Sequence, residues 1–594
     1  MENDLPDDFE LIVIGTGMIE SIVAAAASRI GKKVLHIDSN DFYGGQWASF
    51  NLEGIEKYVI NPQVSSNSTL ENISQYLKEG EQFQTIGNNL FGICNVSHTW
   101  HIPKEQVKES KQNNDSSKTD RENEKNDESK ENVKDNEQNE EIVVTKDSVP
   151  TEDEEWTQAK FLKNSRKFNL DLAPKLQFAR GDFVELLISS NIARYSEYRS
   201  VSRVLTWLNG QLEVVPCSRS DVFSNTRVSV VEKRMLMKLL STCMDGDETK
   251  FNDYQNKTFH TYLKDKKLTP NLIHYVLYAI SMSSDKTSCL EGIENTKRFL
   301  NSLGRFGKTP FLFSMYGSGE LPQAFCRLCA VFGGTYCLNR PVNSLIFDAN
   351  DKCSGVICGS QRINADNVVI SVGNVPDKFA NSWKKQGISR AVFITDRSML
   401  PCEKENLTLL LFPPEDGKKS ITVIELGPAT GTCPQDLYII HMYCEQVSDP
   451  KKDFEHCLNK LLNMNQTEQS IQDEELKQIR PNVLWSLYFT VMDTVDCNTT
   501  NGLSENIYPC PGPDLDLDYD ESVKKAKEIF MKMYPDCEFL PRAPDPEEII
   551  LCDDDSKETE NLPTESELAE NEESNQLKQQ ENITETNNEV IASQ

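Results

Sequence analysis

The fold of this chain is decided close to its start, by residues 10–38, ELIVIGTGMIESIVAAAASRIGKKVLHID. The apolar run from Glu10 to Ile14 predicts a fully buried strand. The alanine-rich stretch from Glu20 to Ile30 predicts a helix with small side chains, and Lys33 to Ile37 predicts a second strand. Together these segments predict a compact βαβ unit.

The turn of this unit carries most of a dinucleotide-binding fingerprint. Gly15-Thr16-Gly17 follows the first strand and Asp38 ends the second, as the fingerprint requires. The third glycine, which lets the helix pack closely while its N-terminus faces a pyrophosphate, is replaced by Glu20. We therefore predict a degenerate dinucleotide turn of Gly15, Gly17, Glu20 and Asp38 with no bound cofactor. A simple tight turn and an intact flavin site are the alternatives.

The rest of the chain predicts a discontinuous α/β fold. Helical spacing from about residue 218 to 303 is clearest over 230–243, 271–282 and 294–303. Strand-like segments such as 344–347 and 437–443 then return, so we predict a flavoprotein-like, Rossmann-type domain with an inserted helical subdomain. The predicted parts are the first part of the dinucleotide-fold domain (1–103), an acidic insert (104–155), the domain continued (156–217), the helical subdomain (218–303), the domain continued again (304–552) and an acidic tail (553–594).

The formal net charge of −31 is concentrated in the insert and the tail. Residues 104–155 hold 9 basic and 18 acidic side chains, and residues 553–594 hold 2 and 13. Neither stretch contains Phe, Tyr, Trp, Cys or Gly, so we predict that both are disordered. Such acidity argues against a nucleic-acid partner and against docking of these stretches on anionic lipid.

Cysteine and histidine usage predicts a reducing compartment and no metal site. The 17 cysteines form no framework, the first residues lack the features of a signal peptide, and we expect a cytosolic protein without a transmembrane segment or lipid anchor. The seven histidines show no metal-ligand spacing; we interpret His98 and His101 as loop residues and His36 as a strand residue. Cys326 and Cys329 form a lone CxxC, for which core thiols are favoured over a metal or redox site.

One further segment is unusual, Phe306 to Leu328 (FGKTPFLFSMYGSGELPQAFCRL). An apolar aromatic stretch and a glycine-rich turn lead here into a probable helix. A buried crossover and a functional loop are both consistent with this pattern.

Several segments together resemble the Rab escort proteins, which share a fold with the Rab GDP-dissociation inhibitors. The resemblance covers roughly residues 1–100 and 156–552. The polar insert and two further segments, SRAV with TDRS (389–398) and DPEEIIL (545–551), resemble the escort branch more than the inhibitor branch. The resemblance to the family as a whole is carried by GTGMIES (15–21), VLHIDSNDFYGG (34–45) with WAS (47–49), VEKRMLMK (231–238), YGSGELPQ (316–323) and VFGGTYCL (331–338).

The resemblance implies a non-catalytic accessory of Rab geranylgeranyltransferase. Its α/β domain would bind GDP-bound Rab GTPases through a platform that includes Tyr43, Arg234 and Lys238. The segment with Phe313, Tyr316 and Leu321 would hold the Rab C-terminal tail.

The resemblance implies that the helical subdomain binds the geranylgeranyl lipid. The same subdomain would dock the α/β heterodimer of the transferase, and Phe259 would make this contact. An apolar groove suits an isoprenoid, because each buried methylene favours binding. Rivals are a Rab GDP-dissociation inhibitor and, from another class, a flavin-dependent oxidoreductase. The candidate groove residues are Leu236, Leu239, Leu272, Ile273, Val276 and Leu277.

Overall fold

The computed structural model describes most of the chain between residues 5 and 542. The acidic insert and tail, which we predict to be disordered, lie almost wholly outside the described residues. The DPEEIIL segment also lies outside them. The described ranges are 5–62, 73–86, 92–104, 155–224, 228–245, 248–380, 386–402, 407–415, 417–464, 480–494 and 502–542.

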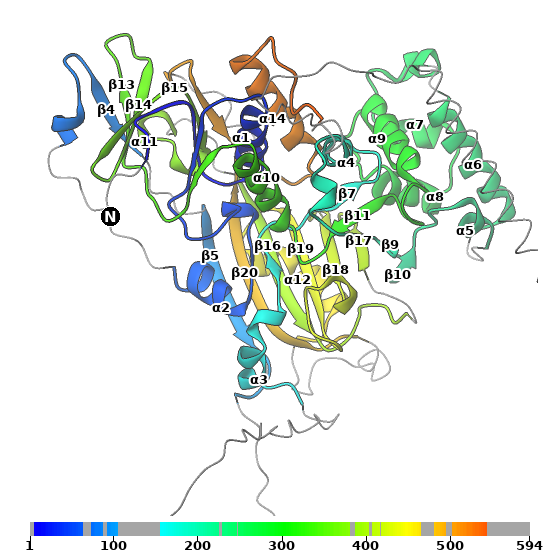
Figure 1. Cartoon of the computed structure of the whole chain (residues 1–594). Helices are drawn as coiled ribbons and strands as arrows, with labels where there is room; N and C mark the ends of the chain where they lie inside the picture. Colours follow the sequence, from blue (N-terminus) through cyan, green and yellow to red (C-terminus); the bar gives the residue numbers. More distant parts are fainter. Residues whose placement is uncertain are drawn as a thin grey trace, which may run out of the picture. The chain divides into compact units, whose positions relative to one another are not determined.

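The first sheet is built on the predicted βαβ unit (Figure 1). Strand β1 (Asp8–Ile14) pairs in parallel with β2 (Val34–Ile37) and β15 (Gln361–Ser371), with helix α1 (Met18–Arg29) between β1 and β2. Leu11, Ile12 and Val13 are fully buried because both faces of the strand are covered. The sheet order is β12-β2-β1-β15-β14-β13-β4, with β21 beside β15. The remaining bounds are β4 Gln82–Thr85, β12 Thr335–Cys337, β13 Ser344–Phe347, β14 Cys353–Cys358 and β21 Ile507–Cys510.

Helices α10 (Glu320–Val331), α14 (Asp520–Met533) and α1 pack together beside this sheet. The α/β architecture predicted from the first 38 residues is thus confirmed. Cys326 and Cys329 are both buried in α10, as expected for core thiols. Helix α4 (Asp182–Ser189) packs against α14.

A second sheet of eight strands was largely missed by the sequence analysis. Its order is β10-β9-β17-β18-β19-β16-β20-β5, and α12 (Pro450–Leu461) packs on β16 and β20. His98 lies within β5, so its prediction as a loop residue was wrong; His101 follows that strand and shares a hydrogen bond with Ser486. The bounds are β5 Ile93–Trp100, β9 Arg203–Leu208, β10 Gln211–Val214, β16 Gln386–Thr395, β17 Leu407–Phe412, β18 Ile421–Leu426, β19 Tyr438–Glu445 and β20 Val483–Asp493.

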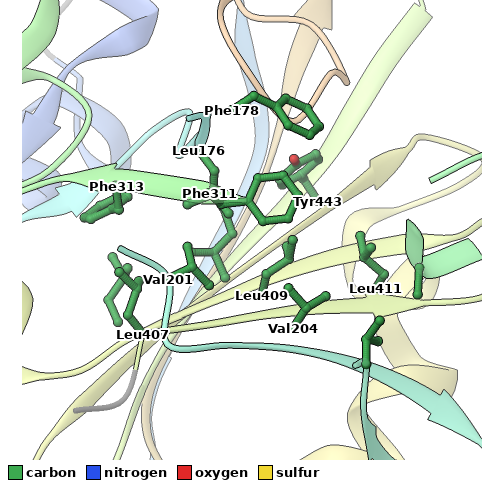
Figure 2. Close-up of a cluster of buried hydrophobic side chains, with 14 of the residues drawn as sticks. Leu176, Phe178, Val201, Val204, Phe311, Phe313, Leu407, Leu409, Leu411 and Tyr443 are labelled. Atoms are coloured by element: carbon green, nitrogen blue, oxygen red, sulfur yellow. The ribbon is translucent and has the colours of Figure 1, made fainter. Parts of the chain in front are cut away.

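Small strands pack with the second sheet and with the helices of residues 219–302 in one large apolar core. Strand β11 (Phe311–Ser314) pairs with β7 (Gln177–Phe178) and β8 (Tyr198–Ser200), and β3 (Ser49–Phe50) pairs with β6 (Leu170–Asp171). Figure 2 shows Phe178 and Phe311 from these strands converging with the leucines of β17. Four further short helices are α2 Leu52–Ile55, α3 Gln158–Lys163, α11 Asp377–Ala380 and η5 Ile192–Arg194.

The described part of residues 219–302 forms five α-helices, the 3-10 helix η6 (Glu248–Tyr254) and one π-helix. Helix α6 begins at Val230 because Ser229 and Glu232 form a capping box there. The predicted helix over 271–282 is instead a short α-helix, α8, that continues as the π-helix η7. Arg298 of α9 pairs with Asp518 at 2.9 Å and with Asp520, which ties this region to the N-terminus of α14. The bounds are α5 Arg219–Ser224, α6 Val230–Met244, α7 Phe259–Asp265, α8 Pro270–His274, η7 Tyr275–Ile280 and α9 Cys289–Ser302.

Candidate functional site

The turn between β1 and α1 is filled by the chain's own carboxyl group. Gly15 has a φ of 104°, which favours glycine, and Gly17 is the N-cap of α1. The Glu20 carboxyl lies so close to Gly17 that a Cβ at Gly17 would clash with its Oε2. Glu20 is only 2% exposed, and this burial raises its pKa to about 8, against hydrogen bonds from its own backbone and Ser371.

Both carboxylate oxygens of Asp38 accept hydrogen bonds from other groups of the same chain. Its Oδ2 accepts a hydrogen bond of 2.7 Å from the Thr16 hydroxyl, and its Oδ1 accepts from the backbone and side chain of Asn40. The Thr16 hydroxyl in turn accepts from the backbone of Gly44 at 2.9 Å. In a dinucleotide fold this acid would bind a ribose hydroxyl and the turn would hold the pyrophosphate. The residues present therefore do not fit a flavin dinucleotide.

Tyr43 lies in an open cavity of about 380 Å³ against α10, which we call the tyrosine pocket. Its ring centroid is 5.4 Å from that of Tyr336, and Arg327 lies over the ring of Tyr195 at 4.7 Å. Glu320 and Arg327 give the pocket both signs of charge. Such a mixture of tyrosine and arginine is typical of protein-binding surfaces. The lining residues are Tyr43, Tyr195, Glu320, Gln323, Ala324, Cys326, Arg327, Ala330 and Tyr336.

Arg234 and Lys238 do not join Tyr43 in this pocket. Both lie one turn apart on the exposed side of α6, which packs against α9 rather than against α10. The charged neighbours of Tyr43 are Glu320 and Arg327, which the sequence analysis did not select. Their spacing of seven residues, two turns of a helix, is the signal that could have placed them on one face.

The segment from Phe313 to Leu321 exposes one of its three selected side chains. Phe313 and Leu321 are fully buried, whereas Tyr316 is 48% exposed. Tyr316 has a φ of 66°, its backbone N–H donates to Thr430 at 2.9 Å, and its ring covers Gly431. The backbone N–H of Ser318 donates to the buried carboxylate of Asp171 at 2.9 Å. The turn is thus held from both sides and presents Tyr316 outward.

Phe259 is fully buried at the start of α7. Its ring stacks on Tyr262, with the centroids 6.0 Å apart, and fills the space beside Gly292 on α9, where a Cβ would clash with the ring. Phe259 is therefore part of the packing between α7 and α9 and is not exposed at the surface. A role in docking would therefore act through the shape of α7.

The six groove candidates are brought together, but as packed core. Leu236, Leu239, Leu272, Ile273, Val276 and Leu277 are all buried in one hydrophobic cluster. Val276 and Leu277 lie in the π-helix η7, an irregular geometry that often marks functional positions. Leu272 also lines a cavity of about 210 Å³ with Leu208 and Tyr275.

Within the described ranges, no group of histidine, cysteine and acidic side chains could hold a metal ion. In the same part of the chain, no helix has the length and apolar character needed to cross a bilayer.

Comparisons with known proteins agree along almost the whole chain. The family model described as GDP dissociation inhibitor matches residues 5–71 and 151–500. Rab proteins geranylgeranyltransferase component A 2 of Mus musculus is 35% identical, with 93% of this chain and 99% of that protein covered. Component A of Drosophila melanogaster is 37% identical, with 93% and 94% covered.

A solved structure shows the same fold. Rab GDI from Plasmodium falciparum has a TM-score of 0.58 at 17% identity, with 89% of this chain and 99% of that chain covered. The chain therefore belongs to the GDP dissociation inhibitor family and, within it, to the Rab geranylgeranyltransferase component A proteins, the Rab escort proteins.

Proposed function

We propose that this chain escorts Rab GTPases. It binds GDP-bound Rab before prenylation, presents it to the α/β heterodimer of Rab geranylgeranyltransferase, and delivers the geranylgeranylated Rab from the cytosol to membranes. The observation that carries this proposal is the similarity to component A proteins over 93% of the chain. The alkylation chemistry, with any zinc it needs, belongs to the transferase. The turn filled by Glu20 supports this non-catalytic role.

The tyrosine pocket is the proposed centre of the Rab-binding platform. It contains Tyr43, which the family resemblance implies, and places Glu320 and Arg327 beside it. Arginine and tyrosine contribute most strongly to binding when they lie in such a depression, where the partner excludes water from them. Arg234 and Lys238 lie outside this pocket and would contact Rab only at a separate place.

Tyr316 is the proposed contact for the Rab C-terminal tail. It is the exposed member of the segment between Phe313 and Leu321, and its turn is held by Thr430 and Asp171. A fixed turn with one outward aromatic ring loses little conformational entropy on binding. Phe313 and Leu321 would position this turn from the core.

Residues 218–303 are proposed as the lipid-binding and transferase-docking subdomain. The six groove candidates already form one apolar cluster, so uptake of a geranylgeranyl chain requires the helices to separate. The short α8 and the π-helix η7 are the proposed place of this opening, because a π-helix is less regular than its neighbours. Phe259 would fix the position of α7 for docking.

The test is geranylgeranyl transfer to a GDP-loaded Rab by purified transferase, with and without this chain. Transfer that depends on the chain, in a preparation without a flavin absorbance band, is the expected result. Transfer that proceeds equally without it would contradict the proposal. An oxidoreductase would instead show a bound flavin, and a GDP-dissociation inhibitor would bind prenylated Rab without binding the transferase.

The docking part needs variants that separate packing from contact. Phe259→Leu keeps an apolar side chain beside Gly292, whereas Lys264→Glu changes the charge of an exposed position on α7. We expect Lys264→Glu to weaken transferase binding and Phe259→Leu to retain most of it. If neither Lys264→Glu nor Phe259→Ala alters transferase binding, α7 is not the docking element.

A further inference from the structure

An exposed apolar cluster lies where α5 ends and α6 begins. Phe223, Val230 and Val231 are 66%, 64% and 65% exposed, and they are three of the four most exposed large apolar side chains in the described part of the chain. The side chain of Lys233 donates to the backbone carbonyl of Phe223 at 2.6 Å, which holds the end of α5 beside the first turn of α6. We call these three residues the apolar tip.

Basic side chains continue from the apolar tip along α6. Arg234 and Lys238 follow Val231 on the exposed side of the helix, and neither has an ion-pair partner among the described residues. The nearby acid Glu232 is engaged by Ser229 and Thr269, and Asp245 at the far end pairs with Lys250. Asp221 is the acidic side chain of α5. The exposed side of α6 near the tip is therefore cationic, on a chain with a net charge of −31.

We propose that the apolar tip and the basic side of α6 form a docking surface for an anionic lipid bilayer. Apolar side chains beside lysine and arginine are the combination that binds membrane interfaces, because the former enter the headgroup region while the latter attract acidic lipids. Three side chains are few for a stable protein interface, which needs about 800 Å² from each partner. Insertion of three apolar side chains can suffice for membrane binding when basic residues contribute electrostatic attraction to acidic lipids. Charge complementarity thus favours the membrane as the occupant.

This surface goes beyond the proposed escort function, in which the chain delivers the prenylated Rab to membranes but has no lipid-binding surface of its own. The inference assigns a lipid contact to the chain itself. It also gives Arg234 and Lys238 a ligand class that their position outside the tyrosine pocket does not supply.

The experiment is sedimentation of the purified full chain with vesicles of phosphatidylcholine alone or with added phosphatidylserine. We expect binding to the mixed vesicles that weakens as salt is raised, and little binding to phosphatidylcholine alone. Val231→Asp should lower the bound fraction about tenfold, and so should Arg234→Gln combined with Lys238→Gln. Aspartate at the second position of α6 is compatible with the helix, since acidic residues are favourable in the first turn.

The matched control is Val447→Asp, because Val447 is 68% exposed but lies outside α5 and α6. It should sediment as the parent chain does. Equal sedimentation of the parent and Val231→Asp chains, or no vesicle binding by the parent, would overturn the proposal. A Val231→Asp chain that binds vesicles normally but no longer supports geranylgeranyl transfer would assign the surface to a protein partner and would overturn it too. Transfer activity of the parent tests the escort function separately.

Discussion

The turn between β1 and α1 and the tyrosine pocket belong to the same α/β part of the chain but use polar side chains in opposite ways. In the turn, the carboxyl groups of Glu20 and Asp38 are buried and directed at groups of the chain itself. In the pocket, Glu320 and Arg327 face an open cavity beside Tyr43. A fold suited to a dinucleotide can therefore fill its internal site with its own side chains and still carry an open, charged cavity elsewhere.

The largest expected effect comes from placing a positive charge in the closed turn between β1 and α1. Glu20→Lys would bury an ammonium group on a longer side chain in a space that is already closed around Glu20 by Gly17 and Ser371. We expect a loss of about 4 kcal/mol in the free energy of unfolding, measured by urea denaturation. The exposed substitution Glu294→Lys on α9 is the control and should change it by less than about 0.5 kcal/mol. A stable Glu20→Lys chain would mean that the turn is open.

The pH dependence of stability sharpens the comparison. Burial raises the pKa of Glu20 from 4.5 to about 8 in the folded chain, so the folded chain holds a proton that the unfolded chain releases. The stability linked to this proton is complete below the unfolded pKa and is lost as the pH rises through about 8.

Between about pH 5 and about pH 8 the free energy of unfolding of the parent chain should therefore fall by roughly 3 kcal/mol more than that of Glu20→Gln, whose side chain cannot ionise. Urea unfolding of both chains at the two pH values measures this difference. Parallel pH profiles would contradict a buried, protonated Glu20.

Removing one hydroxyl tests how completely the turn is satisfied. Thr16→Val keeps the shape of the side chain but deprives Asp38 of a donor and Gly44 of an acceptor. A loss of about 2 kcal/mol is expected, since a buried polar group without a partner costs about 1–3 kcal/mol. The exposed Thr261→Val is a suitable reference for the same chemical change.

The smallest expected effect lies in the tyrosine pocket and concerns binding alone. Arg327→Glu should raise the Kd for a GDP-loaded Rab about tenfold, which corresponds to about 1.4 kcal/mol. The melting temperature should stay unchanged, because Arg327 is exposed. Lys418→Glu, an exposed charge reversal outside the pocket, should leave the Kd as it is. Equal Kd values for both variants would remove the pocket from the platform.

The turn could be predicted from the sequence because its signals are local. Gly15, Gly17, Glu20 and Asp38 lie within one βαβ unit, where strand and helix periods fix their positions. The tyrosine pocket could not be assembled in this way. Tyr43, Tyr195, Arg327 and Tyr336 come from separate segments, and tertiary packing alone brings them together.

The second sheet was missed for related reasons. All six residues of β17 are buried, so the strand lacks the alternation that marks a half-exposed strand. Strand β5 has the reverse problem, because it is polar and pairs at the edge of the sheet, and its SHT sequence reads as a loop. The predicted boundaries of the parts and the roles of the selected residues remain predictions.

The carboxyl group that fills the turn is synthesised with the chain. A flavoprotein whose turn is open reaches its final stability only when its cofactor is supplied, because ligand binding adds to the stability of the folded state. In this chain Glu20 takes that place from the moment the turn forms. The amount of folded protein should therefore depend on its rate of synthesis and not on the flavin supply. Cells grown without riboflavin should contain as much of the folded protein as cells grown with it.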